Sequence, residues 1–365
     1  MEKVLLVVVK KRGTRKYRIK EVTSEMRQLI ESSSGVVIET LTALIEKPSS
    51  SHYLRKGKLG ELKSLVYKCK PKLVIFSIDL SPTQMRNIEK TIGLRIVDRT
   101  GLILDIFARH ATTREGKLQV ELAQLVYLLP RLSDIWEQLS RLGGGIGTRG
   151  PGERQIEVDR RQIRKKITKI KSELEKVRAH RARIRGQRKR NKVFVISIVG
   201  YTNAGKSTLL NQLTGAHVDV QNKLFATLDP TTRRLTFKDG RHVLLTDTVG
   251  FLQDLPHTLI EAFKATLEEI NDSDLILDLS DASDENFEDK QRAVENVLKE
   301  IEADNLKRIK VLNKIDLLES IHARDRIERN YPHHVLISAK AGKGLDRLRT
   351  RIQEEITKQE VVCEH

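Results

Sequence analysis

The sequence has few cysteines, few aromatic residues and no long apolar run. Of its 365 residues, two are cysteines (Cys69 and Cys363) and 4% are aromatic. Two cysteines can form neither a disulfide framework nor a four-ligand zinc site, so redox and structural-zinc roles are set aside. No stretch of about 18 apolar residues is present, and the first segment becomes charged too soon for a secretory signal. We therefore expect a soluble, cytoplasmic protein without a membrane span.

Positive charge is in excess. The sequence has 67 Lys and Arg against 49 Asp and Glu, a net charge of +18, and its apolar content is 39%. That apolar content indicates a globular protein, and the length allows two or three domains. The charge excess points to a polyanionic partner.

The first part of the sequence alternates between two patterns. Apolar, β-rich runs at residues 4–9, 36–38, 73–78 and 94–97 are separated by stretches of helical pattern. Residues 57–67 are one such stretch, and Ser81 with Pro82 marks another helix start. The alternation predicts a small α/β domain over residues 1–110.

Residues 111–192 carry two heptad seams. The seams consist of apolar residues at spacings of four and three, with one gap at Arg181: Leu118, Leu122, Leu125, Leu129, Leu132, Trp136 and Leu139, and then Ile163, Ile167, Ile170, Leu174, Val177 and Ile184. One glycine-rich turn joins the two stretches, so the simplest arrangement is an antiparallel helical hairpin with facing seams. Pro130 should kink the first helix.

The second helix is strongly basic, and a glycine-rich tip precedes it. Residues 153–192 hold 17 basic residues against five acidic ones, which is +12 of the net +18. Such a run can be a solvated face, but self-repulsion at this density favours a nucleic-acid contact. The tip, residues 143–152, contains GxGxxG, yet it follows a helix and not a strand, so it is no dinucleotide fingerprint. We interpret it as an exposed probing tip, with a flexible linker as the alternative.

A phosphate loop follows at residues 200–207. Residues 193–199 predict a buried strand that runs into GYTNAGKS, which is GxxxxGKS in a strand, loop and helix context. Backbone amides of such a loop, with the positive end of the next helix, surround phosphates. Lys206 should neutralise the outer phosphates, and the Ser207 hydroxyl should bind Mg²⁺.

Further nucleotide motifs follow in order. A predicted strand ends in DTVG, where Asp247 would hold the Mg²⁺ shell and the Gly250 amide would sense the γ-phosphate. The loop FATLDPTT lies between, and NKID and SAK follow later strands. The Asp316 carboxylate suits the N1 and N2 edge of guanine, which argues for GTP over ATP. Residues 193–356 are therefore predicted to be a P-loop GTPase domain with a mainly parallel sheet and helices on both faces, ahead of a short tail at 357–365.

These motifs together resemble a known family. GGGIGTRGPGERQIEVDRR, then a basic helix, GYTNAGKST, FATLDPT, DTVGF, NKID and SAK are similar to the HflX family of translational GTPases, over nearly the whole chain. The resemblance implies Lys206, Thr227 and Gly250 as catalytic residues, and Ser207 and Thr227 as Mg²⁺ ligands. The nucleotide contacts that it implies are Gly200, Tyr201, Thr202, Asn203, Ala204, Gly205, Lys206, Ser207, Phe225, Ala226, Thr227, Leu228, Asp229, Asp247, Thr248, Val249, Gly250, Asn313, Lys314, Ile315, Asp316, Ser338, Ala339 and Lys340.

The resemblance also implies partners. It points to GTP and GDP, to the large ribosomal subunit with its ribosomal RNA, and to a tip directed towards the peptidyl-transferase region. For bacterial members it implies the splitting of stalled ribosomes under stress, by a protein that we expect to be a monomer. Some members continue into a C-terminal domain, and no function that rests on that domain is carried over. Two alternatives are a GTP-dependent RNA chaperone or ribosome assembly factor, and an adaptor whose heptad seams pair with a partner helix.

Two residues bear on the hydrolysis step. Phe251 follows DTVG, where many GTPases place a glutamine that orients the attacking water, so we expect slow intrinsic hydrolysis that a partner accelerates. Asn203 stands where cation-dependent GTPases place an asparagine that coordinates K⁺. Because asparagine is also common in tight loops, K⁺ use and a purely structural role are both open.

Overall fold

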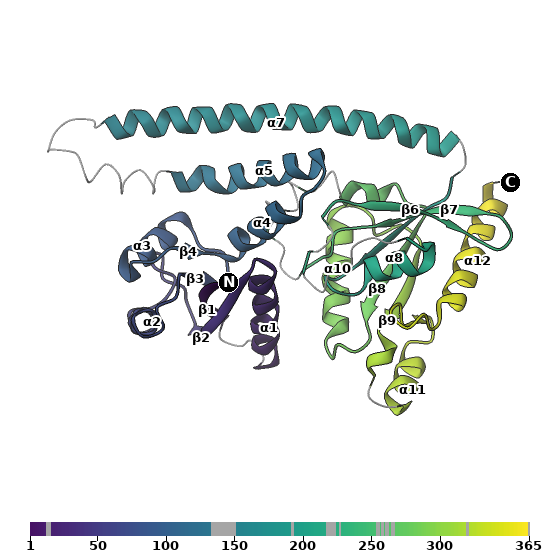
Figure 1. Ribbon diagram of the computed structural model, residues 1–365, viewed down its shortest axis with the longest axis horizontal. Helices are drawn as coiled ribbons and strands as arrows, with labels where there is room; N and C mark the ends of the chain where they lie inside the picture. Colours follow the sequence, from purple (N-terminus) through teal and green to yellow (C-terminus); the bar gives the residue numbers. More distant parts are fainter. Residues whose placement is uncertain are drawn as a thin grey trace. The chain divides into compact units, whose positions relative to one another are not determined.

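The computed structural model divides into two compact units. It describes the chain except for residues 12–15, 133–150, 191–192, 217–223, 226–227, 253–255, 257–258, 260–262, 264–266, 319–320 and 364–365. The first unit is Met1–Arg109 with Lys117–Glu175, and the second is His110–Gly116 with Lys176–His365. The chain passes between the units three times, at the end of α4 (Arg99–His110) and inside α5 (Arg114–Leu128) and α7 (Pro151–Arg190) (Figure 1). Among the helices described, none is long and apolar enough to cross a membrane.

The first unit contains a four-stranded parallel sheet. Its strand order is β2-β1-β3-β4, formed by β1 (Glu2–Lys11), β2 (Gly35–Ile45), β3 (Leu73–Phe76) and β4 (Ile96–Val97). The helices between the strands are α1 (Lys16–Ser32), α2 (Lys56–Cys69) and α3 (Pro82–Ile92), and α4 (Arg99–His110) follows. This is the predicted α/β arrangement.

Two local predictions in this unit have clear outcomes. The helix start at Ser81 is confirmed, because the Ser81 hydroxyl accepts a hydrogen bond from the Gln84 amide at 3.2 Å and the Gln84 side chain accepts one from the Ser81 amide at 3.0 Å. Strand β2 is longer than the predicted 36–38. It lies at the edge of the sheet, where buried residues such as Leu41 alternate with exposed ones such as Thr42. Because this alternation interrupts the apolar run, the prediction missed the second half of the strand.

The helices α5 and α7 form the predicted antiparallel hairpin. Leu122, Ile170 and Leu174 are buried together, so the two seams face each other. Lys166 of α7 pairs with Glu121 of α5. Helix α5 gives way to a 3₁₀ turn, η1 (Leu129–Arg131), at Pro130, where a kink was expected. The seam residues Trp136 and Leu139 and residues 143–150 of the predicted tip lie outside the described residues, and the last two tip residues, Pro151 and Gly152, begin α7.

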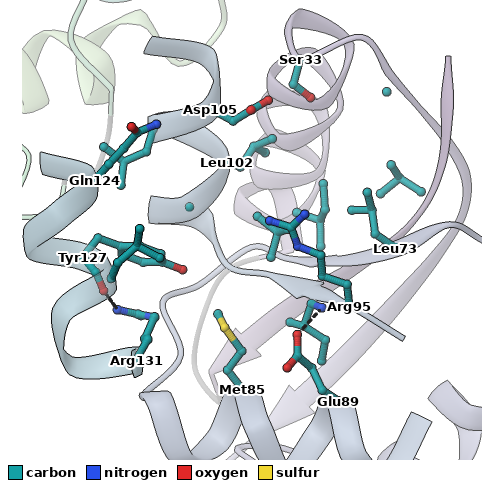
Figure 2. Close-up of a pocket in the computed structure, with 18 of the residues that line it drawn as sticks. Ser33, Leu73, Met85, Glu89, Arg95, Leu102, Asp105, Gln124, Tyr127 and Arg131 are labelled. Carbon is teal, nitrogen blue, oxygen red and sulfur yellow. Dashed lines mark hydrogen bonds between the residues drawn. The ribbon is translucent and has the colours of Figure 1, made fainter. Parts of the chain in front are cut away.

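A cavity of about 790 Å³ opens in the first unit between α3, α4 and α5. Figure 2 shows Tyr127 of α5 and Arg131 of η1 on one side of it and Met85 and Glu89 of α3 on another. The Arg131 guanidinium stacks 3.6 Å from the centre of the Tyr127 ring, and both side chains donate hydrogen bonds to the buried Asp98. Burial, with the nearby Asp98 carboxylate, raises the pKa of Tyr127. This polar cluster fixes α5 against the loop after β4.

The second unit has a six-stranded sheet of order β10-β9-β8-β5-β7-β6, in which only β6 is antiparallel to its neighbour. Its strands are β5 (Val195–Gly200), β6 (Thr231–Thr236), β7 (His242–Asp247), β8 (Leu275–Asp281), β9 (Arg308–Asn313) and β10 (Val335–Leu336). Other elements described in this unit include α8 (Lys206–Thr214), α10 (Phe287–Glu300), η2 (Ile315–Leu317), α11 (Ile321–Asn330) and α12 (Leu345–Cys363).

Helices cover both faces of this sheet, as predicted. Helices α8 and α12 pack on one face, where Leu209 and Ile352 join the core with Ile198 and Val311. Helix α10 covers the other face, and its Glu295 pairs with Lys310 of β9 at 3.4 Å. Because side chains alternate along each strand, each face receives every second residue, and both sets are largely apolar.

Candidate nucleotide-binding site

The phosphate loop lies between β5 and α8 and requires its glycines. A Cβ added at Gly200 would lie 2.2 Å from the Leu279 carbonyl oxygen, and one at Gly205 would lie 2.4 Å from the Asn313 side-chain nitrogen. Gly205 also has φ +94°, a conformation that L side chains rarely adopt. Glycine at these two positions therefore lets the loop pass Leu279 and Asn313 and lead into the N-terminus of α8, a helix end that favours anions.

Lys206 lies folded across this loop. Its side-chain nitrogen donates hydrogen bonds to the carbonyl oxygens of Gly200 at 3.2 Å and Tyr201 at 2.9 Å. Burial lowers the pKa of Lys206 to about 8, and the nearby Asp247 carboxylate partly opposes that shift. A Cβ at Gly250 would lie 3.0 Å from the Lys206 nitrogen, so the DTVG glycine and the lysine lie side by side.

Ser207 and Asp247 form an oxygen pair suited to Mg²⁺. The Ser207 hydroxyl donates a 2.6 Å hydrogen bond to the Asp247 carboxylate, which is fully buried at the end of β7. Hydroxyl and carboxylate oxygens are the ligands that Mg²⁺ prefers, so these residues fit the metal. The neighbouring Thr248 hydroxyl donates to the Ile198 carbonyl at 2.7 Å and fixes the loop after β7. The other residue assigned to Mg²⁺, Thr227, lies outside the described residues together with Ala226.

Asn313 joins the phosphate loop to the SAK loop. Its side-chain nitrogen donates to the Ala204 carbonyl at 2.8 Å, and its side-chain oxygen accepts from the Ala339 amide at 2.8 Å. The loop after β10 is held by Ser338, whose buried hydroxyl accepts from the Ala341 amide at 3.0 Å. The three motifs thus meet at the carboxyl edge of the parallel sheet, where α/β proteins bind ligands.

The remaining residues of NKID and SAK surround this junction. Lys314 pairs with Asp281 at 2.7 Å, a contact that the sequence did not suggest, and Ile315 is buried. Asp316 and Lys340 are exposed at the same edge, where they can face a base. The arrangement suits recognition of a guanine through the Asp316 carboxylate.

The positions of Phe251 and Asn203 bear on hydrolysis. The Phe251 ring is buried, and its backbone carbonyl accepts a hydrogen bond from the Thr202 amide at 2.8 Å. The Phe251 side chain offers no polar group that could orient the attacking water, which agrees with the slow intrinsic rate of GTP hydrolysis that we expect. Asn203 is exposed with φ +62° in the phosphate loop, a conformation that suits asparagine structurally.

The described part of the FATLD loop contacts a region that the sequence did not connect with it. Phe225 and Leu228 are buried, which holds the loop in the core. The Asp229 carboxylate accepts hydrogen bonds from Thr112 and Thr113, immediately before α5. A threonine such as Thr113 is a recognisable residue for the start of a helix. The Asp229 carboxylate that it binds lies 116 residues away in the chain, so the sequence did not connect the two.

Comparison with known proteins places the chain. Residues 20–108 match the family model described as GTP-binding GTPase N-terminal, residues 110–188 match GTP-binding GTPase Middle Region, and residues 195–314 match 50S ribosome-binding GTPase. The GTPase HflX of Caldanaerobacter subterraneus subsp. tengcongensis is 50% identical over 339 residues, which cover 93% of this chain and 78% of that protein. The chain belongs to the GTPase HflX family.

Other relatives agree with this membership. The GTPase HflX of Escherichia coli is 44% identical over 338 residues, 92% of this chain and 79% of that protein. A solved structure of SsGBP in complex with GDP is similar with a TM-score of 0.53 at 26% identity, over 98% of this chain and 99% of that one. A GTP-binding protein from Sulfolobus solfataricus in complex with GDP is similar with a TM-score of 0.50 at 25% identity, over 98% and 100%.

The family and the fold confirm the main sequence predictions. The chain is a GTP hydrolase with an N-terminal α/β region, a helical hairpin and a P-loop GTPase domain. GTPases of this kind use Mg²⁺, and the hydrogen-bonded oxygens of Ser207 and Asp247 are of a kind that fits it. The roles of individual site residues and the use of K⁺ stay predictions.

Proposed function

We propose that this chain, with GTP bound, binds the large ribosomal subunit and splits or rescues stalled ribosomes under stress in the cytoplasm. The exposed basic face of α7 carries the proposal. Its seam residues Ile170 and Leu174 are buried against α5, and its other faces carry exposed basic residues: Arg161, Arg164, Lys165, Lys166, Lys169, Lys171, Lys176, Arg183 and Arg190. The match of residues 195–314 to a 50S ribosome-binding GTPase model supports the same partner.

The charge of α7 favours RNA for a physical reason. Closely spaced cations on one helix repel one another, and a phosphate backbone relieves that repulsion while releasing its counterions. In the proposal, α7 contacts ribosomal RNA and the glycine-rich tip at 143–152 inserts as a wedge. GTP orders the loops that contain Thr227 and Gly250, and hydrolysis releases the protein.

The proposal is tested by the rate of GTP hydrolysis with and without purified large ribosomal subunits. Protein-free RNA at equal phosphate concentration is the control. Stimulation by subunits alone is expected, because Phe251 cannot orient water and a bound partner must order the site. Stimulation by RNA to the same extent would favour an RNA chaperone or assembly factor, and stimulation by neither would refute the ribosome proposal.

The adaptor alternative loses its structural basis. It required the heptad seams to pair with a partner helix, whereas the described seam residues Leu122, Ile170 and Leu174 pack on one another. The RNA chaperone alternative keeps its basis, since the same basic helix would serve it.

The electrostatic contact has its own test. Changing Arg183, Arg185 and Arg188 together to Ala should weaken subunit binding and lower the slope of log affinity against log salt by about 2–3. The matched control changes three exposed lysines of α2, Lys56, Lys63 and Lys68, to Ala and removes the same charge. Equal salt slopes for the two triple variants would exclude α7 as the RNA-binding surface.

A further inference from the structure

Asp229, at the end of the FATLD loop, holds the start of helix α5. One of its carboxylate oxygens accepts hydrogen bonds from the Thr112 amide at 2.9 Å, the Thr112 hydroxyl at 2.7 Å and the Thr113 amide at 2.8 Å. The other oxygen accepts from the Thr113 hydroxyl. Burial raises the pKa of this carboxyl, but the hydrogen bonds from Thr113 and Thr112 outweigh burial and lower the pKa below its usual value. The aspartate is therefore an ionised cap supplied by a distant loop.

The first turn of α5 is shaped to receive this carboxylate. The Thr113 hydroxyl also accepts a hydrogen bond from the Gly116 amide at 3.0 Å, as a helix cap does. A Cβ at Gly116 would lie 2.2 Å from an Asp229 carboxylate oxygen, so only glycine leaves room. A negative charge at a helix N-terminus is also stabilised by the helix dipole. Two threonines, one glycine and a helix end thus converge on one side chain.

A second contact fixes the same turn. Arg181, which occupies the gap in the heptad seam of α7, pairs with Glu115 of α5 at 2.6 Å and with Glu269 at 2.7 Å. Burial raises the pKa of Glu115, while Arg181 lowers it and Asp229 raises it. The gap in the apolar pattern is therefore a charged clamp within the second unit. The turn that Asp229 binds is held from a second side.

Asp229 is also linked to the Mg²⁺-binding pair. It directly precedes Pro230 and strand β6, in which Thr231 pairs with Asp247 of β7. Asp247 in turn accepts the hydrogen bond from Ser207. A shift of Asp229 would therefore move the first residues of β6, which lie beside the Asp247 carboxylate and its partner Ser207.

We infer that Asp229 is a positioning residue for GTP hydrolysis, which holds the FATLD loop against the start of α5 and so transmits the state of the nucleotide site to the hairpin. This role concerns the GTPase activity of the chain and stands independently of the ribosome proposal. Thr112 and Thr113 are the partners through which Asp229 acts, and Gly116 provides the space for it.

The first test is Asp229→Asn in the full chain. The asparagine amide has nearly the size of the carboxylate, but its NH₂ group is a donor and would face the donor groups of Thr112 and Thr113. The hydrogen bonds that hold Asp229 to the start of α5 should therefore be lost. We expect kcat for GTP to fall on the order of tenfold, with KM changed less than threefold, because misplacement acts on the transition state. The matched control is Asp239→Asn, at the other end of the β6–β7 hairpin, where the exposed aspartate accepts from Arg241. Equal kcat values for the two variants would overturn the inference.

Two further variants separate positioning from general stability. Gly116→Ala places a methyl group against Asp229 but improves helix propensity, so kcat should fall while the unfolding temperature stays level or rises. Gly60→Ala in α2, where a Cβ would meet nothing within 4 Å, is the control. Thr113→Val should lower kcat and Thr113→Ser should restore it. A parallel loss of kcat and unfolding temperature, without rescue by serine, would show a merely structural contact.

A readout other than activity tests the coupling. In the wild-type chain, amide hydrogen exchange of residues 112–116 should differ between the complex with GDP and the complex with a non-hydrolysable GTP analogue. In Asp229→Asn that difference should vanish while both nucleotides still bind. Nucleotide-independent exchange in the wild type would refute transmission to α5.

Discussion

Asn313 offers a sharp test of how the site is assembled, because its side chain joins the phosphate loop to the SAK loop. Asn313→Ala removes a donor to the Ala204 carbonyl and an acceptor for the Ala339 amide, both at 2.8 Å, from a residue that is 2% exposed. Each buried polar group left without a partner costs about 1–3 kcal/mol, so the free energy of unfolding should fall by about 2–6 kcal/mol.

That loss converts to a measurable temperature shift. The second unit has roughly 200 residues, and in units of that size 1 kcal/mol corresponds to about 2–4 °C. The lower bound of about 2 kcal/mol therefore predicts a fall of at least about 4–8 °C. Thermal unfolding should be followed on nucleotide-free protein, since a bound nucleotide would add its own stabilisation. Asn330→Ala, at the exposed end of α11, is the control. An unfolding temperature for Asn313→Ala within 1–2 °C of that control, a difference of less than roughly 1 kcal/mol, would refute the reasoning.

Four further outcomes are expected. Ser207→Ala should abolish Mg²⁺-supported GTP turnover, and retained full activity would refute the metal assignment. Gly250→Ala should lower kcat by on the order of 100-fold, because its methyl group would lie 3.0 Å from the Lys206 nitrogen; single-turnover kinetics measure this, and a change below threefold would contradict it. If Asn203 coordinates K⁺, hydrolysis is faster in KCl than in NaCl, and equal rates remove the idea. Burial raises the pKa of Asp278 to about 6, so its ionisation costs stability as the pH rises from about 4 to 6. Asp278→Asn should therefore raise the unfolding temperature more at pH 7.5 than at pH 4.5, and an equal shift would exclude that cost.

Local patterns predicted most of the elements. The GxxxxGKS loop, DTVG, NKID and SAK each follow a strand at the carboxyl edge of the second sheet, because a strand that ends in a polar or glycine-rich loop has a local signature. The heptad seams predicted the hairpin, since a periodic apolar stripe must be buried against another. Pro130 was expected to kink the first helix, because its ring removes a backbone donor, and the 3₁₀ turn η1 lies at this position.

Contacts between distant segments were not predictable. Strand β2 was judged too short, because pairing at a sheet edge leaves alternate residues exposed and weakens the apolar signal. In the sequence, Arg181 only interrupts the heptad seam of α7. In the structure, its guanidinium binds Glu115 and Glu269, which are far away in the sequence. Asp229 was grouped with the nucleotide contacts from its motif, and nothing local indicated the bonds to Thr112 and Thr113.

The sequence by itself indicated the chemistry of the nucleotide site: a phosphate loop, oxygens suited to a metal and a carboxylate suited to guanine, each encoded within a few adjacent residues. Only the tertiary structure decided how that chemistry is anchored. Asn313 joins Ala204 to Ala339, and Asp229 holds the start of α5, across separations of about 26 to 117 residues. A hydrogen bond depends on distance and direction in space, which residue order does not specify until the chain has folded.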